Sequence, residues 1–206
     1  MFKLFTFAAL STLLLSTTAC VTRSKQGSGE ETMHIHTPVG GLEVHTNNLS
    51  PANLGLPAYP GAILTHLPHN NDNSADVDMS FAGWRLRVQV LNYQSSDSRN
   101  TIAAFYKQAL ARYGDVVTCQ NNKAIGEPIK TKDGLTCTND YNYNISLDAN
   151  SHANRNALKN LAGVSNTASL ELRAGSPGNQ HLVVFDPSLP KTVTTFVLMH
   201  VQVPHP

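Results

Sequence analysis

The stretch WRLRVQVLNYQS, residues 84–95, decides the fold that this sequence predicts. Apolar side chains recur at every second position of its first half, at Trp84, Leu86, Val88 and Val90. The positions between them are polar, so an extended chain would bury one face and leave the other in water. The stretch therefore predicts a half-buried β-strand in the middle of a sheet.

An amphipathic helix is predicted directly after this strand. Asp97 or Ser98 is suited to cap its first turn, because a short side-chain oxygen can accept a hydrogen bond from a free backbone N–H. Apolar residues then recur at helical spacing through TIAAFYKQALARY, residues 101–113, and Gly114 is suited to end the helix. We therefore expect a helix over about 98–113, with its apolar stripe packed on the sheet.

Further strands are predicted on both sides. Residues 33–48 are typical of a β-hairpin with a turn at Pro38 and Gly40-Gly41. A strand is expected through Cys137 to Leu147, and residues 152–164 favour either a short helix or a loop. Three stretches near the end, ASLELRAG, QHLVVFDP and TVTTFVLMHVQVP, predict a terminal β-meander. The expected fold class is α+β, a mostly antiparallel sheet with one main helix packed on it.

The first residues have the pattern of a secretion signal. Lys3 precedes an apolar run over residues 4–15, which is shorter than the roughly 20 residues that span a bilayer. Small residues, STTA, then lead to Cys20. A basic start, a short apolar run and small residues before a cut site indicate export.

The end of this segment, LSTTAC, resembles the lipobox of bacterial lipoproteins. The resemblance implies that the signal is cut before Cys20, which then carries a diacylglyceryl group and a further acyl chain such as palmitate. Thr17 stands where the usual pattern has Leu, whereas Ala19 fits it. Val21 is not the Asp that usually retains such proteins in the inner membrane, so outer-membrane delivery facing the periplasm is expected in a double-membraned bacterium. The alternatives are an ordinary secretory cut and an uncut transmembrane anchor.

The domain layout follows from these assignments. Residues 1–19 are expected to be the signal peptide, and residues 20–32 the lipidated cysteine with a flexible polar tether. Residues 33–206 are expected to form a single α+β domain, with the hairpin at 33–48 and the main body at 53–206.

Composition limits the partners of this domain. Only 14% of the residues are charged and the formal net charge is +1, so there is no electrostatic footprint for nucleic acid. Besides Cys20, the chain has Cys119 and Cys137. In an oxidising compartment these two are expected to form a structural disulfide, contributing roughly 3 kcal/mol.

Several short stretches are similar to a module of uncharacterised envelope lipoproteins. They are LGLPAYPGA, SSDSRNTIAAFYKQALARYG, PVGGLEVHTN, SPGNQHLVVF and FVLMHVQVP. They combine a YPGA bend with a Ser-Asp cap and a Phe-Tyr helix face. The resemblance implies an exported domain and no established activity, so it assigns no catalytic residue.

The nine histidines of the chain raise the question of a metal site. If the predicted hairpin pairs Thr37 with Leu42, then His36 faces Glu43 and His34 faces His45. All four polar side chains would share one face, where imidazoles and a carboxylate could hold Zn²⁺ or Cu²⁺. The alternative is an ordinary solvated hairpin face, and a register slip of one residue would break the cluster.

Two further places are candidates for binding. Tyr59 lies on a bend fixed by two prolines and Gly61, and Arg85 and Arg87 share the polar face of the central strand, where they could pair with carboxylates or phosphates. Packing and a solvated strand face are the alternatives.

Function is limited by what the chain lacks. It has no G-x-S-x-G, no H-E-x-x-H and no phosphate-binding loop. We expect a non-enzymatic lipoprotein that is anchored to the lipid bilayer through Cys20 and binds an envelope protein or the cell wall, with no cofactor. The alternatives are a metal-binding lipoprotein that uses the hairpin histidines, and an enzyme acting on envelope glycans, which would need two carboxylates flanking a bond.

Overall fold

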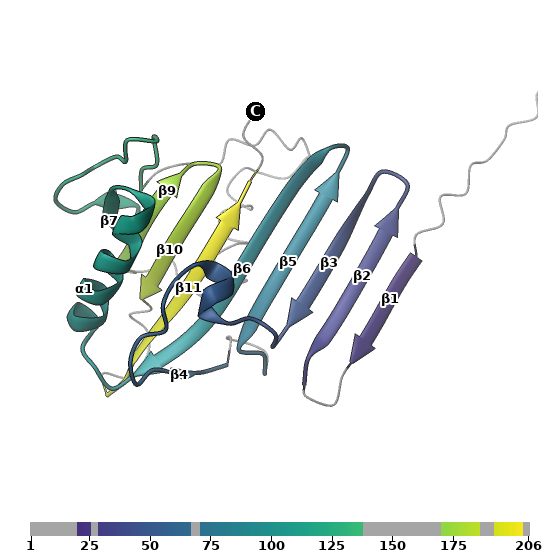
Figure 1. Ribbon diagram of the computed structural model, residues 1–206, viewed down its shortest axis with the longest axis horizontal. Helices are drawn as coiled ribbons and strands as arrows, with labels where there is room; N and C mark the ends of the chain where they lie inside the picture. The colour runs from purple at the N-terminus through teal and green to yellow at the C-terminus, as the bar shows by residue number, and fades with distance from the viewer. Residues whose placement is uncertain (1–19, 26–28, 67–70, 138–169, 186–191, 204–206) are drawn as a thin grey trace, which may run out of the picture.

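The computed structural model describes residues 20–25, 29–66, 71–137, 170–185 and 192–203 (Figure 1). The expected signal peptide, most of the strand that was expected through Cys137 to Leu147, and the segment 152–164 lie outside the described residues. Eleven strands and three short helical segments are described: β1 (Cys20–Lys25), β2 (Glu31–Thr37), β3 (Gly40–Thr46), η1 (Pro51–Leu54), β4 (Ile63–Leu64), β5 (Ser74–Phe81), β6 (Trp84–Ser95), α1 (Arg99–Leu110), η2 (Ala111–Tyr113), β7 (Val116–Gln120), β8 (Lys123–Ala124), β9 (Leu170–Ser176), β10 (Asn179–Phe185) and β11 (Thr194–Gln202).

All these strands join one antiparallel sheet. Its order is β1-β2-β3-β5-β6-β11-β10-β9-β7-β8, with β4 paired to β6 off this path. Strand β6 is central, since β5 and β11 lie on its two sides. The last three described strands form a meander, in which β10 pairs with both β9 and β11.

The α+β class expected from the sequence is wrong, because the fold is largely β. Strand accounts for 53% of the described residues and helix for 14%, in one helical stretch of 15 residues apart from η1. The N-terminal side has more strands than the sequence predicts. Strand β1 occupies part of the expected tether over 20–32, and β5 begins at Ser74 in a polar, asparagine-rich stretch whose composition is typical of a loop.

The helix forms where capping and periodicity favour it. The Ser98 side chain accepts a hydrogen bond from the Thr101 backbone N–H at 3.2 Å. Ile102, Tyr106 and Leu110, at helical spacing, are all fully buried. They pack on the front face of the sheet against residues such as Phe196, forming the larger of the hydrophobic clusters.

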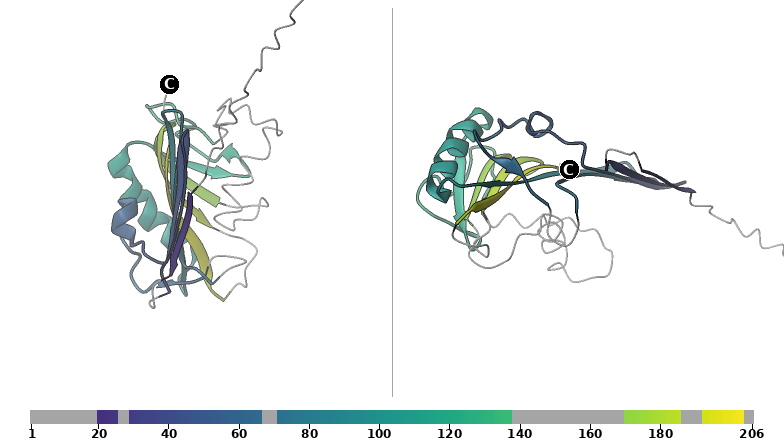
Figure 2. Two further views of the ribbon diagram at one scale, coloured as in Figure 1. Left: turned by 90° about the vertical axis from the view of Figure 1, so that its right-hand side faces the viewer. Right: turned by 90° about the horizontal axis from the view of Figure 1, so that it is seen from below.

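The sheet has two halves that differ in how they are covered (Figures 1 and 2). We call the half formed by β6, β11, β10, β9 and β7 the body; α1 and η1 lie over its front face. We call the strands β1, β2, β3 and β5 the wing. Seen from below in Figure 2, the wing extends from the body as a thin single layer.

Candidate functional site

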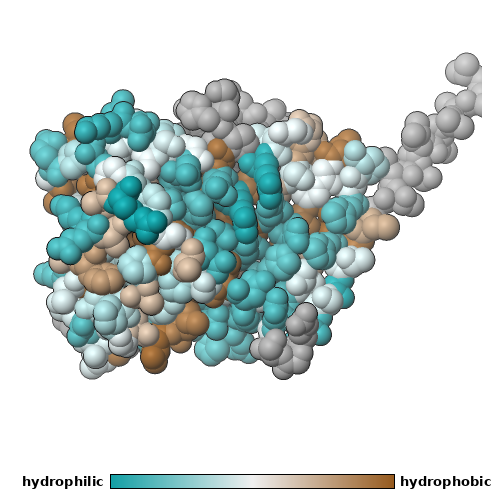
Figure 3. All heavy atoms as spheres, in the orientation of Figure 1, coloured by the Kyte–Doolittle hydropathy of each residue, from teal (hydrophilic) through white to brown (hydrophobic). Residues whose placement is uncertain are grey.

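A row of polar side chains crosses the front face of the sheet from the wing into the body. In antiparallel pairs, directly opposed residues point to the same face, so the strand register carries one row across many strands. Hydrophilic surface covers this middle region in Figure 3. From β2 to β10 the row consists of Thr32, His45, Asp76, Gln89, His200 and His181.

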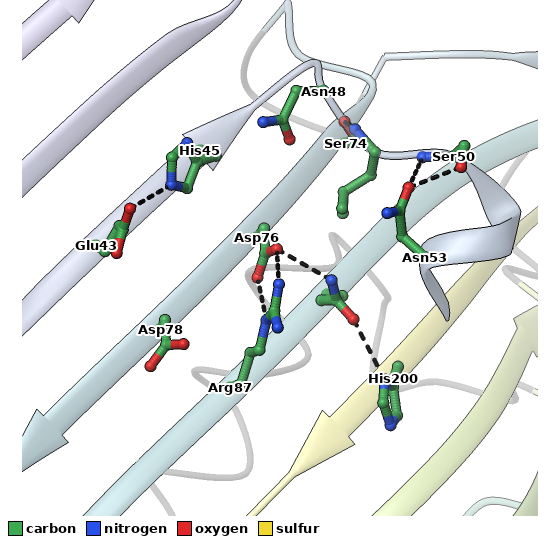
Figure 4. Close-up of polar contacts among 12 residues, drawn as sticks. Glu43, His45, Asn48, Ser50, Asn53, Ser74, Asp76, Asp78, Arg87 and His200 are labelled. Carbon is green, nitrogen blue, oxygen red and sulfur yellow. Dashed lines mark hydrogen bonds and ion pairs between the residues drawn. The ribbon is translucent and has the colours of Figure 1, made fainter. Parts of the chain in front are cut away.

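Asp76 is the centre of a hydrogen-bonded network in this row (Figure 4). The residue is 7% exposed. Its carboxylate accepts hydrogen bonds from Arg87 Nε at 3.0 Å, from Arg87 Nη2 at 2.7 Å and from Gln89 Nε2 at 3.0 Å. The bidentate pair holds the pKa of Arg87 above its ordinary value. Burial of the carboxylate is thus compensated by donors that the opposite strand provides.

A second ion pair, between Asp78 and Arg85, lies closer to the turn of the β5–β6 hairpin. Arg85 Nε donates to Asp78 Oδ1 at 2.9 Å, and this contact holds the pKa of Asp78 below its ordinary value. Arg85 and Arg87 were candidate anion-binding residues. Both guanidinium groups are already paired with carboxylates of the chain itself, so neither presents a free fork to a carboxylate or phosphate ligand.

The row continues into the body as a stack of rings. The His200 ring lies 4.3 Å from that of His181, which in turn lies 3.6 Å from the ring of Tyr113, and all are nearly parallel. His200 Nδ1 contacts Gln89 Oε1 at 3.2 Å, which links the stack to Asp76. His181 is buried and its Nδ1 contacts the Leu54 carbonyl at 3.0 Å. Since a carbonyl only accepts, His181 carries its proton on Nδ1.

Burial keeps both histidines neutral. Burial, with a smaller contribution from the neighbouring His200, lowers the pKa of His181 to about 4. Burial and then the charge of Arg87 lower the pKa of His200. Neither ring is therefore a cationic group for binding anions at neutral pH.

The hairpin histidines lie together, but in a different register from the expected one. His34 is opposite Glu43 and His45 is opposite Thr32, because the turn contains only Pro38 and Val39. The expected pairs, His36 with Glu43 and His34 with His45, are therefore wrong by two residues. A shift of two keeps each side chain on its face, so His34, His36, Glu43 and His45 still share the front of the wing.

Close approach of β5 explains why glycine stands at position 40. A Cβ added to Gly40 would lie 2.1 Å from the Ser80 carbonyl oxygen. The sequence prediction had assigned Gly40-Gly41 to the turn. Their actual place is the start of β3, where Gly40 is opposite Phe81 of β5.

Glu43 is the meeting point of this histidine group. Its Oε1 lies 2.6 Å from His45 Nε2 and 3.5 Å from His34 Nδ1. The His34 and His36 rings are stacked with centroids 6.1 Å apart. Within the described part of the chain, no group of three or more His, Cys, Asp or Glu side chains is arranged to hold a metal ion.

Tyr59 is part of the core. The residue is 7% exposed, and its ring packs edge-on against Phe105 with centroids 5.1 Å apart. Its hydroxyl donates to Asp97 Oδ2 at 2.5 Å, tying the Pro-Gly bend to the residue before the helix cap. The bend therefore turns Tyr59 inward and does not present it to a ligand.

The three cysteines lie in two different environments. Cys119 and Cys137 form a disulfide, as the sequence predicts, and both are buried. Cys20 is exposed and unpaired at the first residue of β1, an edge strand of the sheet. Among the described residues, no helix combines the length and apolarity that a membrane crossing requires.

Comparison of the chain with models of protein families, with curated proteins and with solved structures finds no match to any of them. Function is therefore inferred from the residues described above.

The sequence prediction missed the Asp76, Gln89, His200 and His181 row. Its signal was present in DVDMSFAGWRLR, residues 76–87, where acids and arginines alternate on either side of Ala82-Gly83. A two-residue turn with positive φ at both positions makes this a tight hairpin, so opposite charges face each other.

Proposed function

We propose that this protein is a lipid-anchored lipoprotein of the bacterial cell envelope that holds a β-sheet binding domain at the membrane. The observation that carries the proposal is the environment of Cys20. It follows an apolar run and small residues in the sequence, and in the fold it is exposed and outside the disulfide. A lipid on its sulfur would meet no packed side chains.

The disulfide supports export. Disulfides persist in oxidising compartments outside the cytoplasm, such as the periplasm. A bilayer anchor of several acyl chains is stable, because each buried CH₂ contributes roughly 0.8 kcal/mol. Val21, in place of Asp, favours the outer membrane with the domain facing the periplasm.

The anchor is tested by fractionation of cells that express the Cys20→Ala chain. We expect this variant to leave the membrane fraction and to lose label from radioactive fatty acid, while Cys119→Ala, the same change at another cysteine, keeps both. Membrane association and labelling that persist in Cys20→Ala would contradict the proposal.

The front face of the wing is the surface that we assign to a protein or cell-wall partner. His36 is exposed there, and neither α1 nor η1 covers these strands. A photo-crosslinking residue at position 36 is expected to capture a partner in cells, whereas one at Lys107, exposed on α1, is not. Equal capture at both positions would show that the wing is not the binding surface.

Metal binding at the same face is a second candidate function, favoured by the contacts of Glu43 with His34 and His45. Among the described residues these side chains are not arranged to hold an ion, so binding would require them to rearrange. Calorimetric titration of Zn²⁺ and Cu²⁺ tests it. Tight one-to-one binding that a His34→Ala/His36→Ala variant loses would support a site, and equal binding by both proteins would exclude it.

A further inference from the structure

Exposed hydrophobic side chains gather at one end of the wing, beside Cys20. Val21, Val39 and Phe81 are 62%, 59% and 58% exposed, among the most exposed large apolar side chains in the described residues. Val39 is in the turn between β2 and β3, and Phe81 ends β5. We call these three residues and Trp84, the cross-strand partner of Phe81, the hydrophobic end.

Hydrogen bonds and register hold this group together. The Ala82 N–H donates to the Val39 carbonyl at 2.9 Å, so the β2–β3 and β5–β6 turns are joined. Cys20 is opposite His36, two residues before the turn that contains Val39. Figure 3 shows hydrophobic surface at the upper ends of β5 and the β2–β3 hairpin.

The back of the wing extends the same apolar character. Paired residues form a row across all four wing strands and into β6: Val21, Ile35, Leu42, Met79 and Leu86. Each of the last four is half-buried, and Val21 at the outer edge is mostly exposed. The wing thus has a polar front, an apolar back and, where the turns lie, the hydrophobic end.

We propose that the hydrophobic end inserts into the surface of the phospholipid bilayer beside Cys20. This inference rests on the proposed function, since the anchor brings the bilayer to residue 20. The strand β1 begins at that residue, so no tether separates the anchor from the sheet. A lipid on Cys20 would start at the same corner of the wing, so the bilayer is the apolar phase nearest to these side chains.

The chemistry of the group fits a membrane interface. Phenylalanine and aliphatic side chains favour the acyl boundary, and tryptophan is enriched where an apolar phase meets water. Insertion would fix the orientation of the wing, with its hydrophobic end at the membrane and its polar front left exposed to the periplasm. The anchor alone would leave that orientation free.

Trp84 makes the proposal directly measurable, because it is the only tryptophan of the chain. The full chain, purified from membranes, is reconstituted into phosphatidylcholine vesicles whose acyl chains carry bromine or do not. Bromine quenches tryptophan emission at contact, so a lower emission in the brominated vesicles reports that Trp84 has reached the acyl region. Flotation of the protein with the vesicles reports the anchor separately.

Two double variants sharpen the test. Val39→Ser/Phe81→Ser removes exposed apolar groups of the hydrophobic end, and Ile63→Ser/Ile129→Ser removes two equally exposed isoleucines elsewhere, 60% and 61% exposed. We expect all three proteins to float, with emission quenched in the unaltered chain and in the isoleucine variant, and the quenching lost in Val39→Ser/Phe81→Ser.

Other outcomes overturn the proposal. Flotation without quenching in the unaltered chain would support the anchor and contradict insertion of the hydrophobic end. A dimer found by cross-linking in that case would assign the apolar back of the wing to a second copy of the chain. Equal quenching in the two double variants would also overturn it. A chain that does not float contradicts the anchor. Brominated vesicles are then added to the protein in solution. Lower tryptophan emission supports insertion of the hydrophobic end, and unchanged emission overturns it.

Discussion

The body and the wing belong to one continuous sheet, yet they differ in what lies against it. In the body, Leu198 and Phe196 are fully buried beneath the helix residues Tyr106 and Ile102. In the wing, Leu42 alternates with polar neighbours just as regularly, but it is only half-buried. Alternation therefore makes both halves strands. Only the body is buried on both faces, because α1 packs on its front and residues such as Val90 and Val197 form a second buried cluster on its back. The body holds the hydrophobic core, and most apolar residues of the wing stay only partly buried in the described structure.

The largest expected contrast comes from the same substitution in each half. Leu198→Ala removes buried methyl groups from the core and is expected to lower the free energy of unfolding by about 2–5 kcal/mol. Leu42→Ala in the wing is expected to cost about 1 kcal/mol or less, because its side chain stays partly in water in the folded state. Urea unfolding curves measure both. Equal costs would show that the wing is packed as tightly as the body.

A matched pair of acids tests the boundary between the halves. Asp76 and Asp78 each form a bidentate pair with an arginine, but the side chain of Arg87 is 38% exposed and that of Arg85 is 67% exposed. Asp76→Asn is expected to cost about 1.5–3 kcal/mol, since it leaves donors of a buried network without their charged acceptor. Asp78→Asn is expected to cost about 1 kcal/mol or less. Thermal unfolding compares them, and a reversed order would contradict the placement of the more buried network at Asp76, where β5 of the wing pairs with β6 of the body.

The last comparison concerns the pH dependence of the body. Burial holds the pKa of His181 at about 4, below the ordinary 6.5, so the folded state binds the proton less readily than the unfolded chain. Its contribution to stability is therefore full above about pH 6.5 and is lost as pH falls toward 4. His181→Phe, which keeps a ring against Tyr113, should make the unfolding free energy fall less steeply over this range.

Denaturant titrations at several pH values between those limits measure the slope. The control is His36→Phe, which makes the same substitution at an exposed histidine of the wing. Identical slopes for the chain and His181→Phe would show that proton binding at His181 is not coupled to folding.

The parts of the fold that local pattern determines could be predicted from the sequence. The central strand, the helix after Ser98 and the disulfide all depend on short-range periodicity, capping or the pairing of the two remaining cysteines. Position 40 shows the limit: glycine favours a turn locally, but here it admits the backbone of β5, a neighbour distant in sequence. The hairpin register, and with it the exact partners of His34 and His45, followed from that contact.

The site was harder to predict than the fold. Asp76 lies in a polar, asparagine-rich stretch, so composition favoured a loop, and only its pairing with Gln89 and Arg87 makes it part of a strand. His181 and His200 are in strands that the sequence does predict. Their stacking, however, depends on the β10–β11 register, which no single-strand pattern contains.

The mass of the intact protein extracted from membranes tests the central claim most directly. We predict a chain that begins at Cys20, with the added mass of a diacylglyceryl group and one further acyl chain, and fragments that place this mass on the first residue. A chain that begins elsewhere, or an unmodified Cys20, would contradict the anchor on which the account of the wing depends.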